Sequence, residues 1–174
     1  MECPHSCLNT FRWPYNVAAS MISVVYIWFT PIAGVRPAAL PIQSDSPVSW
    51  SITVGCQMTM TLSKAGSPYF YQYGGTGPNG FDCSGLVQTA FAAAGKYLPR
   101  TAAQQFAAAP VHVPLSEARR GDLLVWGSAP GFYHVAIYLG NGQVVQALNP
   151  DEGIGVTQLS RMAGMQLHPY AARY

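Results

Sequence analysis

From residue 83 onward, the spacing of hydrophobic and polar positions is first helical and then extended. Residues 83–94 carry apolar side chains on one helical face, with Asp82 as the N-cap and Gly95 as the stop. Residues 101–109 form a second, shorter helical segment that Thr101 caps. The pattern therefore predicts two helices in succession, each starting at a polar capping residue.

After residue 121 the pattern is that of short strands joined by tight turns. A strand over residues 134–139 and a return strand over residues 144–148 flank Gly140-Asn141-Gly142, a hairpin turn of the Asn-Gly type. The other predicted strands cover residues 123–126, 154–157 and 171–174. Helices followed by an antiparallel meander indicate an α+β fold.

The N-terminal region leaves three interpretations open. Residues 17–33 are mostly apolar, which fits the hydrophobic core of a secretory signal. A single membrane anchor is the alternative, although Pro31 and Gly34 interrupt the run before the roughly 20 apolar residues that a spanning helix needs. The third interpretation is that translation starts near Met58 or Met60.

The composition of residues 35–65 differs from that of the rest of the chain. This segment contains several Pro, Ser and Gly residues and lacks a core-forming period, so we expect a linker there. We therefore divide the chain into an N-terminal extension, residues 1–60, and one domain, residues 61–174, which we expect to be a monomer. Whether the extension is a signal, an anchor or a pro-region that masks a cleft stays open.

Composition and charge narrow the class of protein. The chain is 49% hydrophobic and 9% charged, with a net charge of +2, which fits one compact domain with an extension. Arg119-Arg120 is too short a basic run to follow a phosphate backbone, so no nucleic-acid partner is expected. Cys3 and Cys7 enclose His5, but no second Cys/His pair follows at zinc spacing, so we predict no metal site. A disulfide among Cys3, Cys7 and Cys56 stays open.

Cys83 and His134 carry the clearest chemistry. Cys83 follows a Gly-rich loop and begins a helix, where unpaired N–H groups and the helix dipole favour a thiolate. His134 begins an apolar strand and is suited to take the thiol proton as a general base. Each residue alone is compatible with a structural role, but together they indicate a cysteine hydrolase. His112 and His168 lie in irregular, Pro-flanked segments and receive no role.

A base also needs a third polar group to orient it. The hairpin brings residues 144–148 back beside His134, and Gln146 is the polar residue in that otherwise apolar return strand. Its carboxamide is suited to hold the imidazole tautomer, although it stabilises an imidazolium less than a carboxylate would. The alternative is that Gln146 faces solvent on the alternate spacing of the strand.

These motifs resemble the NlpC-type family of bacterial cell-wall cysteine peptidases, which are papain-like in their core. The order and spacing of the motifs agree over residues 67–157, whereas the first sixty residues share nothing with the family. The matching blocks are Pro68 to Gly75, Gly80 to Val87, Leu98 to Thr101, Gly121 to Leu123 and His134 to Gly142.

The resemblance implies a papain-like core in which an N-terminal catalytic helix packs on an antiparallel sheet. It implies that Cys83 is the nucleophile, that His134 is the base and that Gln146 occupies the third polar position, which varies within the family. No cofactor is implied, because a thiol, an imidazole and hydrogen-bond donors suffice for this chemistry.

The resemblance also assigns residues around the nucleophile. Tyr71 falls where family members place a tyrosine whose hydroxyl helps to stabilise the oxyanion; the alternative is a core aromatic. Asp82 and Ser84 match positions that in some members contact the free amine of the stem peptide, although Asp82 is also a natural helix cap. Arg100 and Thr101 are interpreted as structural.

The function that the resemblance implies is hydrolysis of peptidoglycan stem peptides, typically at the bond between D-glutamate and the following diamino acid. We therefore expect a secreted or cell-wall-associated protein, with any membrane contact made through the N-terminal segment only. Two alternatives stay open: a non-catalytic peptidoglycan-binding module, and a thiol amidase or acyltransferase on the same core. A cellular and a phage role are equally compatible with the sequence.

Overall fold

A computed structural model of the protein describes the backbone of residues 47–174 and the side chains of residues 54–174. The interpretations of residues 17–33, and the disulfide and metal hypotheses that involve Cys3 and Cys7, lie outside the described residues. Within the described part of the chain, no helix is long and apolar enough to cross a membrane.

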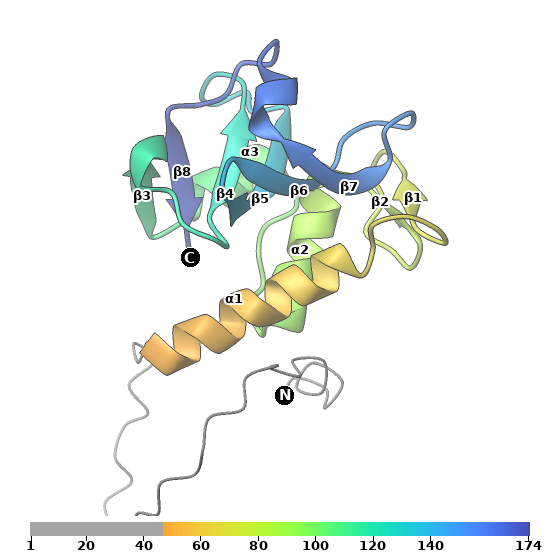
Figure 1. The fold of residues 1–174 in the computed structure, drawn as a ribbon, viewed down its shortest axis with the longest axis horizontal. Coiled ribbons are helices and arrows are strands. Elements are labelled where there is room, and N and C mark those ends of the chain that lie inside the picture. Colours follow the sequence, from red (N-terminus) through yellow and green to blue (C-terminus); the bar gives the residue numbers. More distant parts are fainter. Residues whose placement is uncertain (1–46) are drawn as a thin grey trace, which may run out of the picture.

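The central element is a six-stranded antiparallel sheet with the strand order β3-β8-β4-β5-β6-β7 (Figure 1). A separate two-stranded parallel sheet precedes it in the chain. The strands are β1 Phe70–Tyr71, β2 Gly80–Phe81, β3 Val111–Pro114, β4 Leu123–Trp126, β5 His134–Gly140, β6 Gln143–Ala147, β7 Ile154–Gln158 and β8 Tyr170–Arg173. Together with the helices, this sheet confirms the predicted α+β class.

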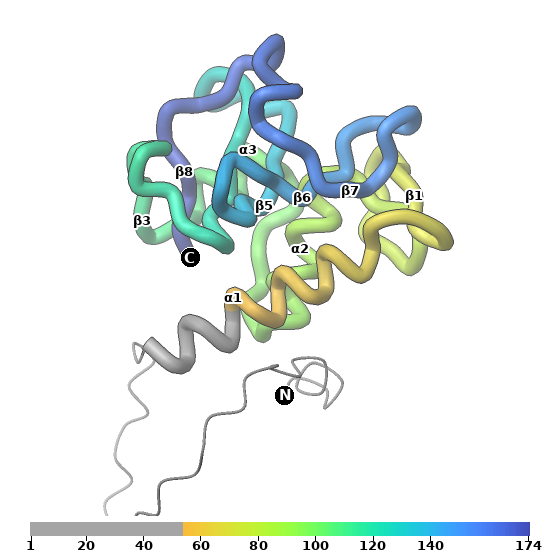
Figure 2. Tube along the Cα trace, in the orientation of Figure 1, coloured from red at the N-terminus to blue at the C-terminus, as the bar shows by residue number. Residues whose placement is uncertain are grey.

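Over residues 47–174, three α-helices accompany the sheet: α1 Pro47–Leu62, α2 Cys83–Ala93 and α3 Ala102–Ala107. The trace runs from α1 through β1 and β2 into α2, which packs against β5 and β6 (Figure 2). Asp82 caps α2 by accepting from the backbone N–H of Gly85, and Thr101 caps α3 in a capping box with Gln104. Both helices and both caps agree with the sequence prediction.

The two faces of the sheet bury separate hydrophobic clusters. One face packs on α2 through Val135, Ile137 and Val145, against Phe91. The alternating residues of the same strands point the other way and meet Met162 at the end of the short 3-10 helix η3, Leu159–Met162. At about 1.5–3 kcal/mol for each large apolar side chain fully buried, the first of these clusters contributes substantially to holding α2 against the sheet.

The linker prediction is wrong for residues 47–62, because this segment forms α1. That helix lies against α2 (Figure 1), with Cys56 and Met58 buried. It also runs across the proposed boundary between residues 60 and 61. The irregular assignment is likewise wrong for His112, which lies in β3 and pairs with Ala172.

Candidate active site

Tight backbone packing fixes the position of Cys83. Cys83 is the first residue of α2 and follows β2 by one residue. A Cβ at Gly85 would stand 2.0 Å from the carbonyl oxygen of Gly75, so only glycine lets the first turn of α2 approach that loop so closely. A Cβ at Gly75 would meet the Gly80 oxygen at 2.6 Å. The glycines around the cysteine therefore allow the loop to pack closely against the start of the helix.

The surroundings of Cys83 act on its thiol in opposite directions. Burial raises the pKa of Cys83, and the negative charge of Asp82 adds to this rise, while hydrogen bonding from the backbone of Val135 and from Ser84 lowers it in part. The net direction is upward, so the resting group is a thiol rather than the thiolate that a helix start alone would favour. Since Val135 directly follows His134, this contact also brings the start of α2 to the start of β5.

His134 lies buried at the start of β5, with a 4% exposed surface. Its ring packs at 5.1 Å from the ring of Trp126, which is its register partner on β4. Burial lowers the pKa of His134, and the hydrogen bond to Gln146 opposes this only in part. The imidazole is therefore neutral near pH 7, which is the state that a general base requires.

Gln146 does not face solvent: it is 2% exposed and lies beside His134. The two atoms His134 Nε2 and Gln146 Oε1 are 2.7 Å apart. Because a carboxamide oxygen can only accept, the Nε2–H of His134 donates to it, and Nδ1 is left with its lone pair free. The pair on β5 and β6 thus holds one tautomer of the imidazole.

Tyr71 lies in β1 and belongs to a small cluster with Phe81 and Leu86 at the base of α2. Burial raises the pKa of Tyr71, and the charges of Cys83 and Asp82 raise it further. The phenol thus stays protonated and lies near enough to Cys83 to respond to its charge. A protonated hydroxyl at this place is suited to donate to a developing oxyanion.

Asp82, Ser84 and Arg100 form a charged cluster beside Cys83. Arg100 contacts both carboxylate oxygens of Asp82, at 3.0 and 2.5 Å, and donates to Ser84 Oγ at 2.8 Å. Burial raises the pKa of Asp82, but hydrogen bonds from Arg100 and Gly85 more than offset this, so the net direction is downward. Sequence reasoning treated Arg100 as structural and missed this contact; the available signal was its place in the Leu98 to Thr101 block.

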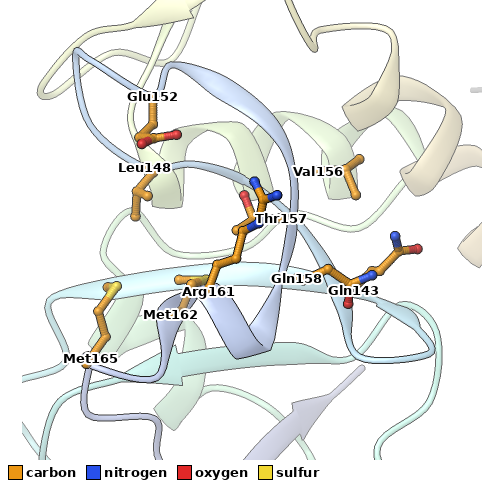
Figure 3. Close-up of a pocket in the computed structure, with 10 residues that line it drawn as sticks. Gln143, Leu148, Glu152, Val156, Thr157, Gln158, Arg161, Met162 and Met165 are labelled. Carbon is orange, nitrogen blue, oxygen red and sulfur yellow. The ribbon is translucent and has the colours of Figure 1, made fainter.

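Outside this site, two further features of the described residues are relevant: the absence of a metal centre and the presence of a cavity. Among the described residues, no group of three or more His, Cys, Asp or Glu side chains is arranged to hold a metal ion. A cavity of about 490 Å³ lies beside β6, β7 and η3 (Figure 3). Met162 lines this cavity and also contacts Gln146, so the cavity borders the polar pair without containing it.

A short α2 that carries a cysteine at its start and packs on an antiparallel sheet defines a papain-like α+β domain. The family model described as the NlpC/P60 family matches residues 67–170, and the chain belongs to this family. The match begins before β1 and ends at the first residue of β8, so it contains every residue of the site described above.

Several curated relatives resemble part of this chain. Peptidoglycan endopeptidase RipB of Mycobacterium tuberculosis is 46% identical over 94 residues, which cover 54% of this chain and 37% of RipB. Peptidoglycan endopeptidase RipA of the same species is 41% identical over 125 residues, covering 65% of this chain and 25% of RipA. The chain thus spans well under half the length of these relatives.

Solved structures agree with this assignment. RipB from M. tuberculosis superposes with a TM-score of 0.61 at 36% identity, covering 74% of this chain and 67% of that chain. The NlpC/P60 domain of the peptidoglycan hydrolase SagA gives a TM-score of 0.61 at 33% identity, covering 70% of this chain and 98% of the domain. Structures of RipA mutated at a cysteine, a histidine and a glutamate give TM-scores of 0.61–0.64.

Proposed function

We propose that this protein is a cysteine endopeptidase that hydrolyses peptidoglycan stem peptides. The observation that carries the proposal is the buried hydrogen bond between His134 and Gln146 at the start of β5, whose next residue, Val135, contacts the cysteine that begins α2. In this arrangement Cys83 is the nucleophile, His134 is the base and Gln146 orients the base.

The electrostatics support a reaction that starts from neutral groups. His134 Nδ1 takes the proton of the Cys83 thiol as the sulfur attacks the carbonyl carbon of the substrate, and a tetrahedral oxyanion forms. The Tyr71 hydroxyl donates to that oxygen. The imidazolium then returns its proton to the leaving amine, and an acyl-enzyme remains. Water, deprotonated by the same imidazole, attacks the thioester and frees the thiol.

The names of the relatives support the choice of substrate. RipB and RipA are called peptidoglycan endopeptidases, and p60 of Listeria monocytogenes a probable endopeptidase. The histidine and the glutamate changed in the RipA structures are 12 positions apart, the same interval that separates His134 from Gln146. We place the cut at the bond between D-glutamate and the diamino acid, and the protein outside the cell or at its wall.

Asp82 and Ser84 are proposed to contact the free amine of the stem peptide. Their carboxylate and hydroxyl already accept from Arg100, so an ammonium group would share Asp82 with the guanidinium. Because the two cations repel each other, this arrangement favours a substrate amine that approaches the Asp82 carboxylate from the side away from Arg100.

Digestion of purified peptidoglycan by the full chain tests the proposal, with products identified by mass spectrometry. We expect fragments cut after D-glutamate, and none with a Cys83→Ala variant of unchanged circular dichroism. Cutting at another amide would keep Cys83 and change the substrate class. A folded wild type that binds sedimented peptidoglycan without cutting it would favour the non-catalytic binding module.

A further inference from the structure

The two ends of the Gln146 carboxamide have different partners, and both are buried. Gln146 Oε1 accepts from His134, while Gln146 Nε2 donates to the sulfur of Met162 at 3.5 Å. Gln146 is 2% exposed and Met162 5% exposed, so water does not replace either partner. The orientation of the amide therefore depends on which protein atoms surround it.

The sulfur of Met162 distinguishes the two ends of the amide. A thioether is a weak acceptor and has no hydrogen to donate, so it attracts an N–H and repels a carbonyl oxygen. If the amide rotated by half a turn, Oε1 would face the sulfur and Nε2–H would face the imidazole. His134 Nε2 would then have to accept, and the ring proton would move to Nδ1, where it blocks the lone pair that a base needs.

We infer that Met162 is a positioning residue that selects the catalytic tautomer of His134 through the orientation of the Gln146 amide. The inference deepens the proposed function and rests on it for the role of His134, but not for the hydrogen-bond chain itself. Met162 touches neither substrate nor reacting atoms in this scheme. Its effect passes from Sδ through the carboxamide to Nε2 of the imidazole.

The chain offers a matched control for this inference. Met165 lies three residues further on, lines the same cavity as Met162, and packs against the same cluster (Figure 3). No hydrogen bond joins its sulfur to Gln146 among the described contacts. Methionine to leucine conserves volume closely enough for the fold to persist, so Met162→Leu and Met165→Leu make the same chemical change with and without the amide contact.

The first test measures the tautomer and the rates of these two variants in the full chain. Nitrogen-15 NMR of wild-type His134 at pH 7.5 (roughly one unit above the ordinary histidine pKa) should show the proton on Nε2. In Met162→Leu we expect a mixture of tautomers and a kcat lowered roughly fivefold, the effect of losing one weak buried hydrogen bond, with KM unchanged. Met165→Leu should leave tautomer and kcat as in the wild type.

The second test uses Gln146→Glu as the background. A carboxylate presents oxygens at both positions and has no amide end to select, so Met162→Leu should lower kcat in the wild type but not in Gln146→Glu. An equal fold loss in both backgrounds would mean that Met162 only packs, and the inference would be overturned. An unchanged tautomer in Met162→Leu, or a proton on Nδ1 in the wild type, would overturn it as well. The NMR result does not depend on the substrate, so it stands even if peptidoglycan proves not to be cut.

Discussion

The two polar clusters beside Cys83 are built on opposite electrostatic principles. Asp82, Ser84 and Arg100 form a charged cluster in which the Arg100 side chain is 35% exposed, and the lowered pKa of Asp82 keeps its carboxylate ionised. His134 and Gln146 form a neutral cluster that is 4% and 2% exposed. One cluster holds fixed charges near water, whereas the other excludes both charge and water.

This difference matches the role that we propose for each cluster. The charged cluster caps α2 and ties it to Arg100, which is a structural task that a permanent ion pair performs well. In the proposed mechanism, the His134 ring of the neutral cluster gains and loses a proton. A buried carboxylate in place of Gln146 would cost desolvation energy and would favour an imidazolium at rest. A neutral amide orients the base without charging it.

The largest effect is expected from removing His134, the proposed base of the neutral cluster. His134→Ala should lower kcat/KM for peptidoglycan fragments on the order of 10²–10⁴-fold, because proton transfer to and from the thiol is lost. His112→Ala removes an exposed histidine from β3 and should keep the wild-type rate. Retained activity in His134→Ala would show that the neutral cluster is structural only.

The next largest effect on the rate is expected from a substitution of Tyr71. Tyr71→Phe removes the hydroxyl proposed to donate to the oxyanion and should lower kcat on the order of a hundredfold with little change in KM. Tyr73→Phe makes the same change at a side chain that is 91% exposed and should be neutral. Equal rates for the two variants would assign Tyr71 to the core alone.

The charged cluster should affect the stability of the fold as well as the binding of the substrate amine. Asp82→Ala removes the cap of α2 and leaves Arg100 without its carboxylate, so we expect the free energy of unfolding to fall by about 2 kcal/mol, of which about 1 is capping. Asp82→Asn keeps a capping oxygen and should lose less. Urea unfolding followed by circular dichroism measures both, beside Asp151→Ala at an exposed loop position. If Asp151→Ala lowers the free energy of unfolding as much as Asp82→Ala does, the charged cluster does not contribute specifically to stability.

Local signals made most of the fold predictable from the sequence. The hairpin follows from its turn, where Asn141 and Gly142 both adopt positive φ (53° and 71°), as an Asn-Gly turn of this type requires. The helix α2 follows from its cap and its apolar face. By contrast, α1 has no acidic residue in its first turn and no basic residue in its last, and its burial becomes evident only once α2 is in place.

The parts of the site that the sequence missed depend on contacts between distant residues. Arg100 is 18 residues from Asp82, and Met162 is 16 residues from Gln146. No helical or strand period relates residues this far apart, so neither contact can be predicted from a local sequence pattern. Gln146 was predictable because the hairpin itself brings β6 back beside His134.

The smallest expected effect comes from Gln146→Glu, which replaces the amide of the neutral cluster with a carboxylate. Burial holds the pKa of His134 below its ordinary value of 6.5, so the acid limb of kcat/KM in the wild type should lie below pH 6.5. In Gln146→Glu a negative charge beside the ring raises that pKa, because it favours the imidazolium. The acid limb should therefore move to higher pH by about one unit or more.

The same substitution changes how stability depends on pH, with a sign that follows from proton uptake. In the wild type the unfolded chain binds a proton at His134 as pH falls below 6.5 while the folded protein resists it, so the free energy of unfolding decreases in that range. Gln146→Glu should reduce this loss, since its folded state accepts the proton more readily. Urea midpoints between pH 8 and pH 5 (roughly 1.5 units on either side of the ordinary histidine pKa) measure the difference. If both the acid limb and these midpoints stay as in the wild type, the charge at position 146 does not act on His134, and the contrast between the two clusters does not govern the base.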